Sequence, residues 1–438
     1  MVRSYRDIPL WKNVTDEEWN DWRWQLRHRI TSTNQLRQVI PVSDDEADAI
    51  DQCLTRLRMA ISPYYSTLID PTDPDDPIRK QAVPTLAETR EGPGEMVDPL
   101  HEDVDSPVAG LTHRYPDRVL FLVTDQCSMY CRHCTRRRLA GQTDRARGGN
   151  QIAAAIDYIR RTPAVRDVLL SGGDPLTLAD NKLEDLIREL RTIPHVEIIR
   201  IGTRMPVVVP QRVTKELAEM LGKYHPIWIN VQFNHPRELT PEAAKACDIL
   251  TRQGIPLGNQ SVLLRGVNDC PVIMRQLVCG LLKIRVRPYY IYNCDPSLGI
   301  SHFRTSVSKG IEIIESLRGH TTGLAVPVFV VDAPGGGGKI PVGPDYVISR
   351  SPKTVVLRNY EGLISGVPEC PDYRDPCASG CPHCENDPAS VGVMRVLRGE
   401  RSAIGPEESL RRRNNASVTE QSTAAEIPGP QTMKVGTQ

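Results

Sequence analysis

The sequence predicts an α/β protein, in which an open (partial) (β/α)6 barrel follows a helical N-terminal region and precedes a C-terminal metal-binding segment. From about residue 119, short apolar runs alternate with helical segments, which is the pattern of a parallel sheet that curls toward a barrel. The cysteine spacing CxxxCxxC occurs at 127–134, directly after the first of these runs, and again at 377–384. The first triad therefore falls at the carboxyl end of a strand, where barrels place their chemistry.

The N-terminal region is assigned to residues 1–110. Thr15 is followed three residues later by Glu18, and this capping box predicts the start of a helix. Tryptophans and a leucine recur at helical spacing after it, and we interpret them as packing residues. The Pro/Asp-rich stretch 70–77 then interrupts regular structure.

The barrel is assigned to residues 111–300. Its strands are predicted from six apolar runs: Val119–Thr124, Val165–Leu170, Val196–Ile201, Ile227–Phe233, Ile255–Leu264 and Val286–Tyr292. Helical segments such as Asn150–Arg161 and Thr240–Gln253 separate these runs. Thr240-Pro241 is a typical N-cap followed by proline at the first helical position.

The composition limits the classes of protein to consider. The chain has 54 Lys+Arg and 54 Asp+Glu, so its formal net charge is zero, and this balance does not suggest a nucleic-acid-binding protein. No apolar run approaches the roughly 20 residues of a membrane helix, and the N-terminus lacks the apolar stretch of a signal peptide. We therefore expect a cytoplasmic protein. Because the cytosol is reducing, the 12 cysteines indicate metal ligation and not disulfides.

Cys127, Cys131 and Cys134 form the first triad. Three thiolates at this spacing can hold three irons of a [4Fe-4S] cluster and leave the fourth iron open. Radical S-adenosylmethionine (SAM) enzymes use such an open iron to chelate SAM before they cleave it reductively. Zinc ligation is the alternative for clustered cysteines in an intracellular chain. The strand before the triad and the βα repeats after it favour the cluster.

The C-terminal part of the chain carries the second triad, Cys377, Cys381 and Cys384. Only a polar tail follows it, so we interpret this triad as a structural metal site, with zinc as the metal. It ends a segment assigned to residues 301–385, which also contains a glycine-rich lysine loop. Residues 400–438 are expected to form a disordered tail.

Gly172, Gly173 and Asp174 follow the second apolar run. Two adjacent glycines let the backbone approach a ligand closely. In a radical SAM barrel this position resembles the glycine-rich element that meets the amino group of SAM. A tight turn explains the same residues equally well, so the motif alone does not decide between the two readings.

The segment 328–339 places Asp332, four glycines and Lys339 after an apolar strand. It is not a phosphate-binding P-loop, because Ala333 stands where the first glycine belongs and Ile340 replaces the Ser/Thr that binds magnesium. The functional reading is a lysine that forms a Schiff base with pyridoxal 5′-phosphate (PLP). A flexible loop with a solvated lysine is the other reading.

Several motifs together resemble the lysine 2,3-aminomutase family over roughly residues 10–385. They occur in the same order as in the family: LTHRYPDR at 111–118, CSMYCRHCTRRR at 127–138, GVNDC at 266–270, RPYYIYNCD at 287–295 and DAPGGGGK at 332–339. The agreement of several distinct motifs argues against chance similarity.

The resemblance implies which residues bind cofactors. The [4Fe-4S] cluster would be bound by the first cysteine triad, and PLP would be bound covalently by Lys339. SAM would meet the turn formed by Gly172, Gly173 and Asp174. Further contacts to PLP or its phosphate are expected from four residues: Arg114, Tyr115, Arg118 and Gln260.

The resemblance also implies how the substrate is held. Arg136 would pair with the substrate carboxylate, for which a planar guanidinium is well suited. Asp295 and Asp332 would receive the distal cation of the substrate. The rest of the basic run 135–138 is expected to include at least one solvated arginine.

The family's zinc site has a remote fourth ligand, which Cys270 matches. It would join Cys377, Cys381 and Cys384 and tie subunits together. The gap between Cys377 and Cys381 is wider than in the family, and Cys370 lies nearby, so the fourth ligand is left open.

The implied activity is that of a radical SAM, PLP-dependent 2,3-aminomutase, an isomerase of the intramolecular aminotransferase type. A 5′-deoxyadenosyl radical would abstract the C3 hydrogen of L-lysine, and the α-amino group would migrate to C3 through a PLP-stabilised radical to give β-lysine. The migration needs no external base, which agrees with a site lined by binding groups. The partners implied are the amino acid, a reducing protein such as flavodoxin or ferredoxin, and further copies of the chain in a homo-oligomer.

Arginine, with β-arginine as product, is the alternative substrate, because a guanidinium can also meet two carboxylates. Asn293 and Pro296 beside Asp295 bear on the depth of the pocket. Glutamate is disfavoured, since a buried pair of carboxylates without a cation is costly. A reading from another class, an iron–sulfur protein that modifies RNA or serves metal-dependent interactions, gives no role to Asp332 and Lys339.

Overall fold

The computed structural model describes residues 3–55 and 58–370. These residues form two compact units, which are described separately. The first comprises residues 3–346 and 358–363, with the gap at 56–57, and the second comprises 347–357 and 364–370. The predicted tail and the second cysteine triad lie outside the described residues.

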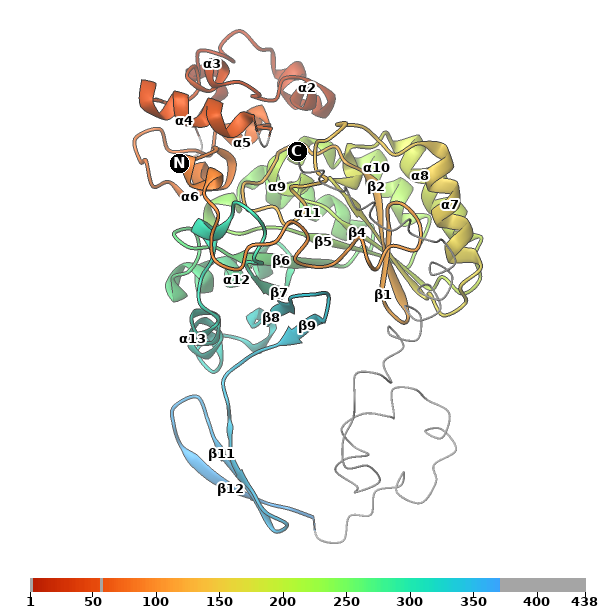
Figure 1. Cartoon of the computed structure of the whole chain (residues 1–438), viewed down its shortest axis with the longest axis vertical. Coiled ribbons are helices and arrows are strands. Elements are labelled where there is room, and N and C mark those ends of the chain that lie inside the picture. Colours follow the sequence, from red (N-terminus) through yellow and green to blue (C-terminus); the bar gives the residue numbers. More distant parts are fainter. Residues whose placement is uncertain (1–2, 56–57, 371–438) are drawn as a thin grey trace, which may run out of the picture. The chain divides into compact units, whose positions relative to one another are not determined.

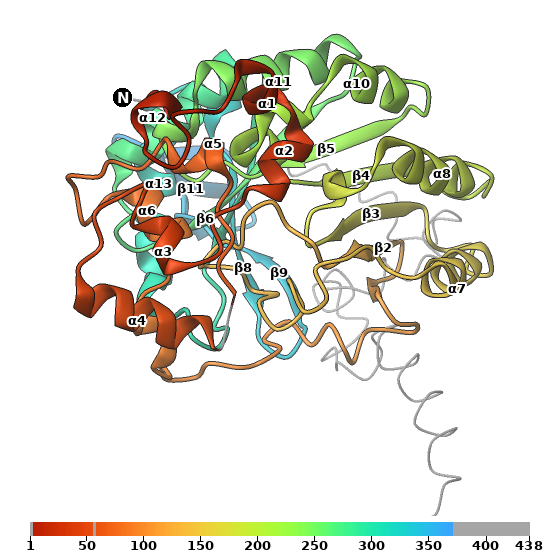
Figure 2. The same cartoon turned by 90° about the horizontal axis from the view of Figure 1, so that it is seen from above.

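A nine-stranded sheet forms the centre of the described first unit, with its strands in chain order from β1 to β9 (Figures 1 and 2). Strands β2 to β8 pair in parallel, so their carboxyl ends meet at one edge of the sheet, and the antiparallel strands β1 and β9 flank them. The strands are β1 (Leu111–Tyr115), β2 (Arg118–Thr124), β3 (Asp167–Gly172), β4 (Ile198–Gly202), β5 (Ile227–Val231), β6 (Leu257–Leu263), β7 (Arg287–Asn293), β8 (Val328–Ala333) and β9 (Gly338–Pro341).

Helices follow the parallel strands and lie around the outside of the sheet (Figure 2). They are α7 (Gly149–Arg160), α8 (Asp180–Arg191), α9 (Met205–Val208), α10 (Lys215–Gly222), α11 (Pro241–Arg252), α12 (Pro271–Lys283) and α13 (Val307–Leu317). These helices pack against the sheet through one apolar face. In helix α8 this face consists of residues that recur at helical spacing and are buried: Leu183, Leu186, Ile187 and Leu190.

The described N-terminal region contains six helices: α1 (Asp16–Asn20), α2 (Trp22–Arg27), α3 (Thr33–Leu36), α4 (Asp44–Leu54), α5 (Pro63–Ser66) and α6 (Pro77–Ala82). The predicted capping box of Thr15 and Glu18 is confirmed at the start of α1. Buried hydrogen bonds attach this region to the segments that follow the barrel strands. Tyr64 Oη lies 2.6 Å from the Thr240 hydroxyl, and Tyr65 Oη donates to Glu238 at 2.7 Å. The N-terminal helices therefore cover part of the carboxyl edge of the sheet.

The predicted fold class is confirmed. The six predicted strands correspond to β2 through β7, with ends that differ by at most two residues. The strand predicted just before Asp332 is β8, which joins the sheet as a further parallel strand, and Lys339 lies on strand β9 instead of in a loop. The turn between these strands is tight because Gly335 and Gly336 adopt positive φ values of 75° and 74°.

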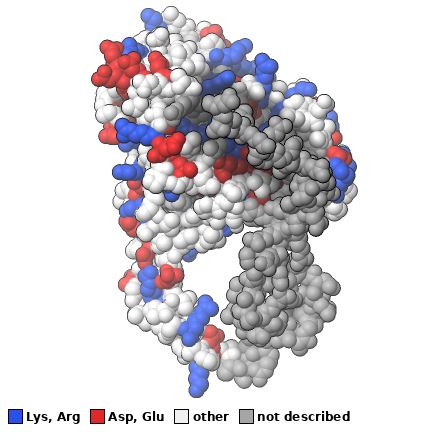
Figure 3. Space-filling view, in the orientation of Figure 1, with Lys and Arg blue, Asp and Glu red and all other residues white. Residues whose placement is uncertain are grey.

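The second unit contains a three-stranded sheet of β10 (Val347–Arg350), β11 (Thr354–Arg358) and β12 (Ile364–Pro368), in that order. None of the helices in the described part of the chain combines the length and the apolar composition that a bilayer-spanning segment requires. Basic and acidic side chains are interspersed on the face drawn in Figure 3, which agrees with the formal net charge of zero.

Candidate active site

A cavity of about 620 Å³ lies at the carboxyl edge of the sheet. Its wall brings together the predicted cofactor- and substrate-binding residues from segments far apart in the chain. They are Arg114, Tyr115, Arg118, Cys127, Cys131, Cys134, Arg136, Gly172, Gly173, Asp174, Gln260, Asp295, Asp332 and Lys339. A shared cavity is the condition for a common site, while the role of each residue is still a prediction.

The first cysteine triad lies on the loop after β2, called the cluster loop here (residues 127–134). Burial and the charges of the neighbouring thiols raise the pKa of Cys127, and they raise the pKa of Cys134 to about 11. Such thiols need a bound cation to stay ionised at neutral pH. Within residues 3–55 and 58–370, no three His, Cys, Asp or Glu side chains come together as ligands of one ion. Three thiols on one loop remain the predicted ligands of a [4Fe-4S] cluster, in which each cysteine would bind a different iron.

The N-terminal region holds the cluster loop in place. The backbone N–H of Arg132 donates to the carbonyl oxygen of Gln81 at 2.9 Å. The buried guanidinium of Arg132 pairs with Glu88, with Nε 2.8 Å from Oε1. The helices before the barrel therefore contribute to the geometry of the site, although they carry none of its predicted ligands.

Gly172 and Gly173 pack against the chain just before the cluster loop. Gly172 has a φ of 132°, and a Cβ atom on it would lie 2.2 Å from the carbonyl oxygen of Thr124. A Cβ atom on Gly173 would lie 2.2 Å from the carbonyl oxygen of Gln126. The N–H groups of Gly173 and Asp174 donate to these two oxygens, each at 2.7 Å. Glycine is required here because two backbones are in contact.

Asp174 orders this turn from inside the protein. Its carboxylate accepts from the Thr203 hydroxyl at 2.7 Å and from the backbone N–H of Arg204 at 2.8 Å. Burial raises the pKa of Asp174 to about 6, against the lowering effect of these hydrogen bonds. The contact of this turn with SAM stays a prediction.

Gly173→Ala is expected to displace the cluster loop, because the added methyl group overlaps a backbone oxygen that no rotamer change can move. We expect iron incorporation on reconstitution to fall by about 10- to 100-fold. Iron and sulfide analysis measures this, with Gly149→Ala as the control, since a Cβ atom there meets nothing within 4 Å. Full iron content in Gly173→Ala would contradict the packing argument.

Lys339 and Asp332 face each other across the β8–β9 hairpin. The strand register pairs them directly, and Lys339 Nζ lies 3.2 and 3.3 Å from the two carboxylate oxygens of Asp332. Nζ also lies 5.1 Å from the centroid of the Tyr292 ring, so the cation is attracted to the ring face as well. The predicted PLP lysine and a predicted substrate aspartate thus form an ion pair.

Asp295 lies on the loop after β7, and the charges of Lys339 and Asp332 also affect its pKa. Burial, and after it the negative charge of Asp332, raises the pKa of Asp295 to about 7, while Lys339 and Arg136 act to lower it. Burial and the neighbouring carboxylate of Asp332 therefore disfavour the ionised form of Asp295. A ligand that brings another cation would stabilise it.

Arg136 is held by Glu102, a buried residue that the sequence analysis did not select. Glu102 Oε1 accepts from Nε at 2.9 Å and from Nη2 at 2.8 Å. Burial acts to raise the pKa of Glu102, but the charge and the hydrogen bonds of Arg136, together with the charge of Arg114, lower it below its ordinary value. Within the described part of the chain Nη1 makes no hydrogen bond, so this nitrogen of a fixed guanidinium is available to a ligand.

The expectation of a solvated arginine beside Arg136 is wrong. Arg137 donates to the carbonyl oxygen of Gly299 at 2.8 Å and pairs with a buried glutamate, and its side chain is 12% exposed. Arg138 pairs with Asp98 at 3.1 Å and is 14% exposed. Acidic side chains from distant segments neutralise the run, which a local charge pattern does not reveal.

The four predicted PLP contacts differ in how free they are. Arg114 Nε donates to the buried carboxylate of Asp105 at 2.8 Å, so its charge is already neutralised. Arg118 lies over the Tyr115 ring, with Cζ 3.9 Å from the centroid, and is partly exposed. Tyr115 Oη accepts from the backbone N–H of Lys339 at 3.0 Å and so connects the two edge strands. Arg118 also pairs with a carboxylate, that of Asp117 at 2.9 Å, but this pair is partly exposed, whereas the pair of Arg114 and Asp105 is buried. Arg118 is therefore the more accessible phosphate candidate of the two arginines.

The predicted zinc site is described only in part. Cys270 precedes α12 and is exposed, as is Cys370. The predicted ligands Cys377, Cys381 and Cys384 lie outside the described residues.

Glu102, Tyr292 and Arg204 are among the cavity-lining residues that sequence reasoning did not select. Arg204 Nη1 lies 2.8 Å from the sulfur of Cys131. For Glu102 the only signal in the sequence is the acidic run 102–105, which complements the arginines at 136–138. Tyr292 lies within the motif at 287–295 but was not selected as a site residue, and Arg204 belongs to no motif.

Two family models match the sequence. One, described as the radical SAM superfamily, matches residues 121–276. The other, described as lysine-2,3-aminomutase, matches residues 314–431. Together they cover the cluster loop, strands β3 to β6 of the barrel and the segment with Lys339, whereas strand β7 lies between the two matched ranges.

The chain is also similar to proteins of assigned activity over most of its length. It is 60% identical to L-lysine 2,3-aminomutase of Clostridium subterminale over 403 residues, which covers 92% of this chain and 96% of the relative. The L-lysine 2,3-aminomutase of Bacillus subtilis (strain 168) is 52% identical, with 92% and 87% covered. The glutamate 2,3-aminomutase of Clostridioides difficile (strain 630) is 48% identical, with 80% and 83% covered. Identity is therefore higher to these two lysine enzymes than to the glutamate enzyme.

Proposed function

The chain belongs to the lysine 2,3-aminomutase family of radical SAM proteins, and we propose that it moves the α-amino group of L-lysine to C3 and releases β-lysine. Aminomutases are isomerases, and the relatives named L-lysine 2,3-aminomutase support this reaction. The observation that carries the proposal is a single cavity lined by the cysteine triad, Lys339, Arg136 and the carboxylates of Asp295 and Asp332.

The charges of the cavity suit L-lysine, which has a carboxylate at one end and an ammonium group at the other. Arg136, fixed by Glu102, offers a guanidinium nitrogen to the carboxylate. The distal ammonium group meets Asp295 and Asp332, whose mutual repulsion it relieves. Glutamate would bring a further negative charge to this pair and is therefore disfavoured.

The residues present also fit the cofactors of the family. Cys127 and Cys134 of the cluster loop have raised pKa values and need a cationic partner to stay ionised, and Lys339 offers a primary amine to PLP. When bound, the [4Fe-4S] cluster reduces SAM to methionine and a 5′-deoxyadenosyl radical, while PLP carries the migrating amino group and delocalises the unpaired spin.

The chain itself contributes binding and orientation. Tyr115 accepts from the backbone of Lys339 and holds β9 against β1, so the lysine stays at the mouth of the barrel. Arg118 supplies a positive charge for the PLP phosphate. Lys339 Nζ would hold PLP covalently, and in that state the amine would no longer pair with Asp332, whose carboxylate would be available to the substrate.

Further parts of the proposal concern the surroundings of the enzyme. We assign a structural zinc ion to the second triad, with Cys270 or Cys370 as the fourth ligand. We also propose that the functional form is a homo-oligomer. A flavodoxin or ferredoxin is the proposed electron donor, and the cytoplasm is the proposed compartment. These assignments are supported by the resemblance of the sequence.

Product analysis under anaerobic conditions tests the proposal, with reconstituted iron, PLP, SAM and a reductant, and with lysine, arginine and glutamate offered in parallel. β-Lysine as the main product is the expected result. β-Arginine as the main product would show that arginine, the alternative substrate, is the one the pocket binds. If none of the three gave a β-amino acid, although the enzyme held cluster and PLP, the proposed function would be wrong.

Lysine binding is expected to weaken as the pH falls through about 7. The pKa of Asp295 is about 7 in the empty site, so below this pH the carboxyl group is protonated and loses its attraction for the ammonium group. PLP on Lys339 removes a cation that acts to lower this pKa, so the loaded enzyme should titrate at this pH or above it. Calorimetry from pH 6 to 9 should show proton release on lysine binding at low pH.

The control for this pH dependence is Asp295→Asn, which cannot titrate. Its affinity for lysine should be lower and nearly independent of pH over the same range. A wild-type enzyme whose lysine affinity stays constant from pH 6 to 9 would contradict the assignment of Asp295.

A further inference from the structure

We propose that Arg204 is a positioning residue for the iron–sulfur cluster. Its guanidinium donates a hydrogen bond to the sulfur of Cys131 and thereby raises the reduction potential of the cluster. The inference deepens the proposed function and rests on it, because it requires that the first triad binds a cluster. Cys131 is one of three ligands, and Arg204 comes from a different part of the barrel.

The contact is made from the loop after β4. Arg204 Nη1 lies 2.8 Å from Cys131 Sγ, and the whole residue is 6% exposed. Among the described residues, Arg204 is the only side chain that donates a hydrogen bond to a sulfur of the triad. Its Nε is also buried and has no hydrogen-bond partner there. The guanidinium therefore approaches the cluster loop without bulk water between them.

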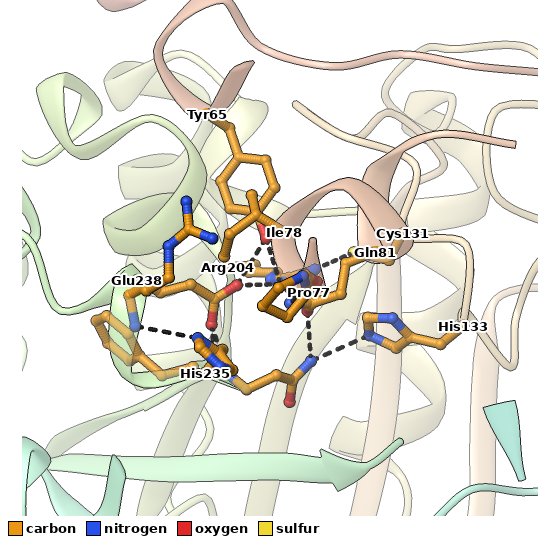
Figure 4. A network of polar contacts seen from close by, with 12 residues as sticks. Tyr65, Pro77, Ile78, Gln81, Cys131, His133, Arg204, His235 and Glu238 are labelled. Carbon is orange, nitrogen blue, oxygen red and sulfur yellow. Dashed lines mark hydrogen bonds and ion pairs between the residues drawn. The ribbon is translucent and has the colours of Figure 1, made fainter. Parts of the chain in front are cut away.

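The other side of the guanidinium is fixed by a buried network (Figure 4). Nη2 donates to Gln81 Oε1 at 2.6 Å and to Glu238 Oε1 at 2.7 Å, and it lies 3.3 Å from Tyr65 Oη. Gln81 and Tyr65 come from the N-terminal helices, whereas Glu238 follows β5. Three separate segments thus prevent Arg204 from turning away from Cys131.

Glu238 balances the charge of Arg204. It is fully buried and also accepts from Tyr65 Oη at 2.7 Å and from the backbone N–H groups of Asn234 and His235 at 2.6 and 3.0 Å. The pair is therefore close to neutral as a unit. Cys131 therefore interacts chiefly with an oriented N–H group of Arg204, and much less with a net positive charge.

A role in stability alone does not account for this arrangement. A buried Arg–Glu pair is often no more stabilising than apolar side chains of the same size, so the fold does not need it. A hydrogen bond to a ligand sulfur, by contrast, has a direct consequence for a cluster. It stabilises the reduced form, which carries one more negative charge, and hydrogen bonds to sulfur are among the factors that set the potentials of such clusters.

The test is a potentiometric titration of the reconstituted full-length protein, followed by electron paramagnetic resonance of the reduced cluster. Two changes are compared with the wild type. Arg204→Lys keeps the charge and loses the planar fork, and the double variant Arg204→Met/Glu238→Gln removes the pair together, so that no unpaired carboxylate is left buried. Arg79→Met/Glu46→Gln is the control, because it removes a pair of a buried arginine and a partly exposed glutamate, neither of which donates a hydrogen bond to a sulfur of the triad.

We expect the ratio of reduced to oxidised cluster at a fixed poise to fall about tenfold in the double variant, which corresponds to about 59 mV for a one-electron couple. Arg204→Lys should lie between this value and the wild type, and the control should equal the wild type. Unchanged potentials in both Arg204 variants, at full iron content, would overturn the inference.

The outcomes separate this inference from the proposed function. If the double variant failed to incorporate iron, Arg204→Lys would decide, and a wild-type potential in that variant would overturn the inference. A wild-type protein that assembles no reducible cluster would instead overturn the proposed function. A cluster whose potential ignores Arg204 leaves the proposed function standing.

Discussion

Replacement of Lys339 by alanine is expected to abolish the formation of β-lysine and the retention of PLP. Lys339 carries the only primary amine among the described residues that line the cavity, so no other side chain there can bind the PLP aldehyde covalently. Activity should fall below detection. The measurement is product formation, together with PLP that stays on the chain after borohydride reduction and gel filtration.

The control separates covalent binding from charge. Lys339→Arg keeps a cation opposite Asp332, where Lys339 Nζ lies 3.2 Å from Oδ1, but it cannot hold PLP covalently. We expect it to be as inactive as the alanine variant. Lys309→Ala, which removes an exposed lysine paired with Glu312, should behave as the wild type. Substantial activity in Lys339→Arg would show that the ion pair, and not the covalent bond, is what the reaction requires.

The fold could be predicted from the sequence because short stretches of residues indicate its strands and the starts of its helices. Strands β2 to β5 are rich in Val, Ile and Leu, and Thr15 and Glu18 form their capping box within four residues. The segment around Lys339 was harder to predict. Its glycines indicate a loop, yet two of them supply the positive φ values of a tight turn, and the lysine after them lies on a strand that faces Asp332.

The supporting residues of the site were not accessible in this way. Glu102 and Arg136 are 34 residues apart, and Arg204 is 73 residues from Cys131. Such pairs form only when the sheet brings distant loops to the same edge, and neither Glu102 nor Arg204 carries a local signature of its own. The cofactor-binding motifs could be selected from the sequence, whereas the groups that orient them required the structure.

Asp332→Asn is expected to reduce kcat/KM for lysine strongly, and the effect should lie mainly in KM. A hydrogen bond to a charged group contributes about 1.5–3 kcal/mol, which corresponds to about 10- to 100-fold. Steady-state kinetics with the reconstituted enzyme measures this. Asp185→Asn, at an exposed aspartate paired with Arg188, is the control and should have no effect. A KM for lysine equal to that of the wild type would contradict a role of Asp332 in binding the distal ammonium group.

The same substitution makes a second prediction about charge that a purely structural effect does not share. Asp332 acts to raise the pKa of Asp295, so its removal should lower that pKa and move the loss of lysine affinity to a more acidic pH than in the wild type. Glutamate should at the same time be rejected less strongly, because one of the two charges that repel its side chain is gone. An Asp332→Asn enzyme that binds lysine weakly, but keeps the midpoint near pH 7 and the full discrimination against glutamate, would show that Asp332 shapes the pocket without acting through its charge.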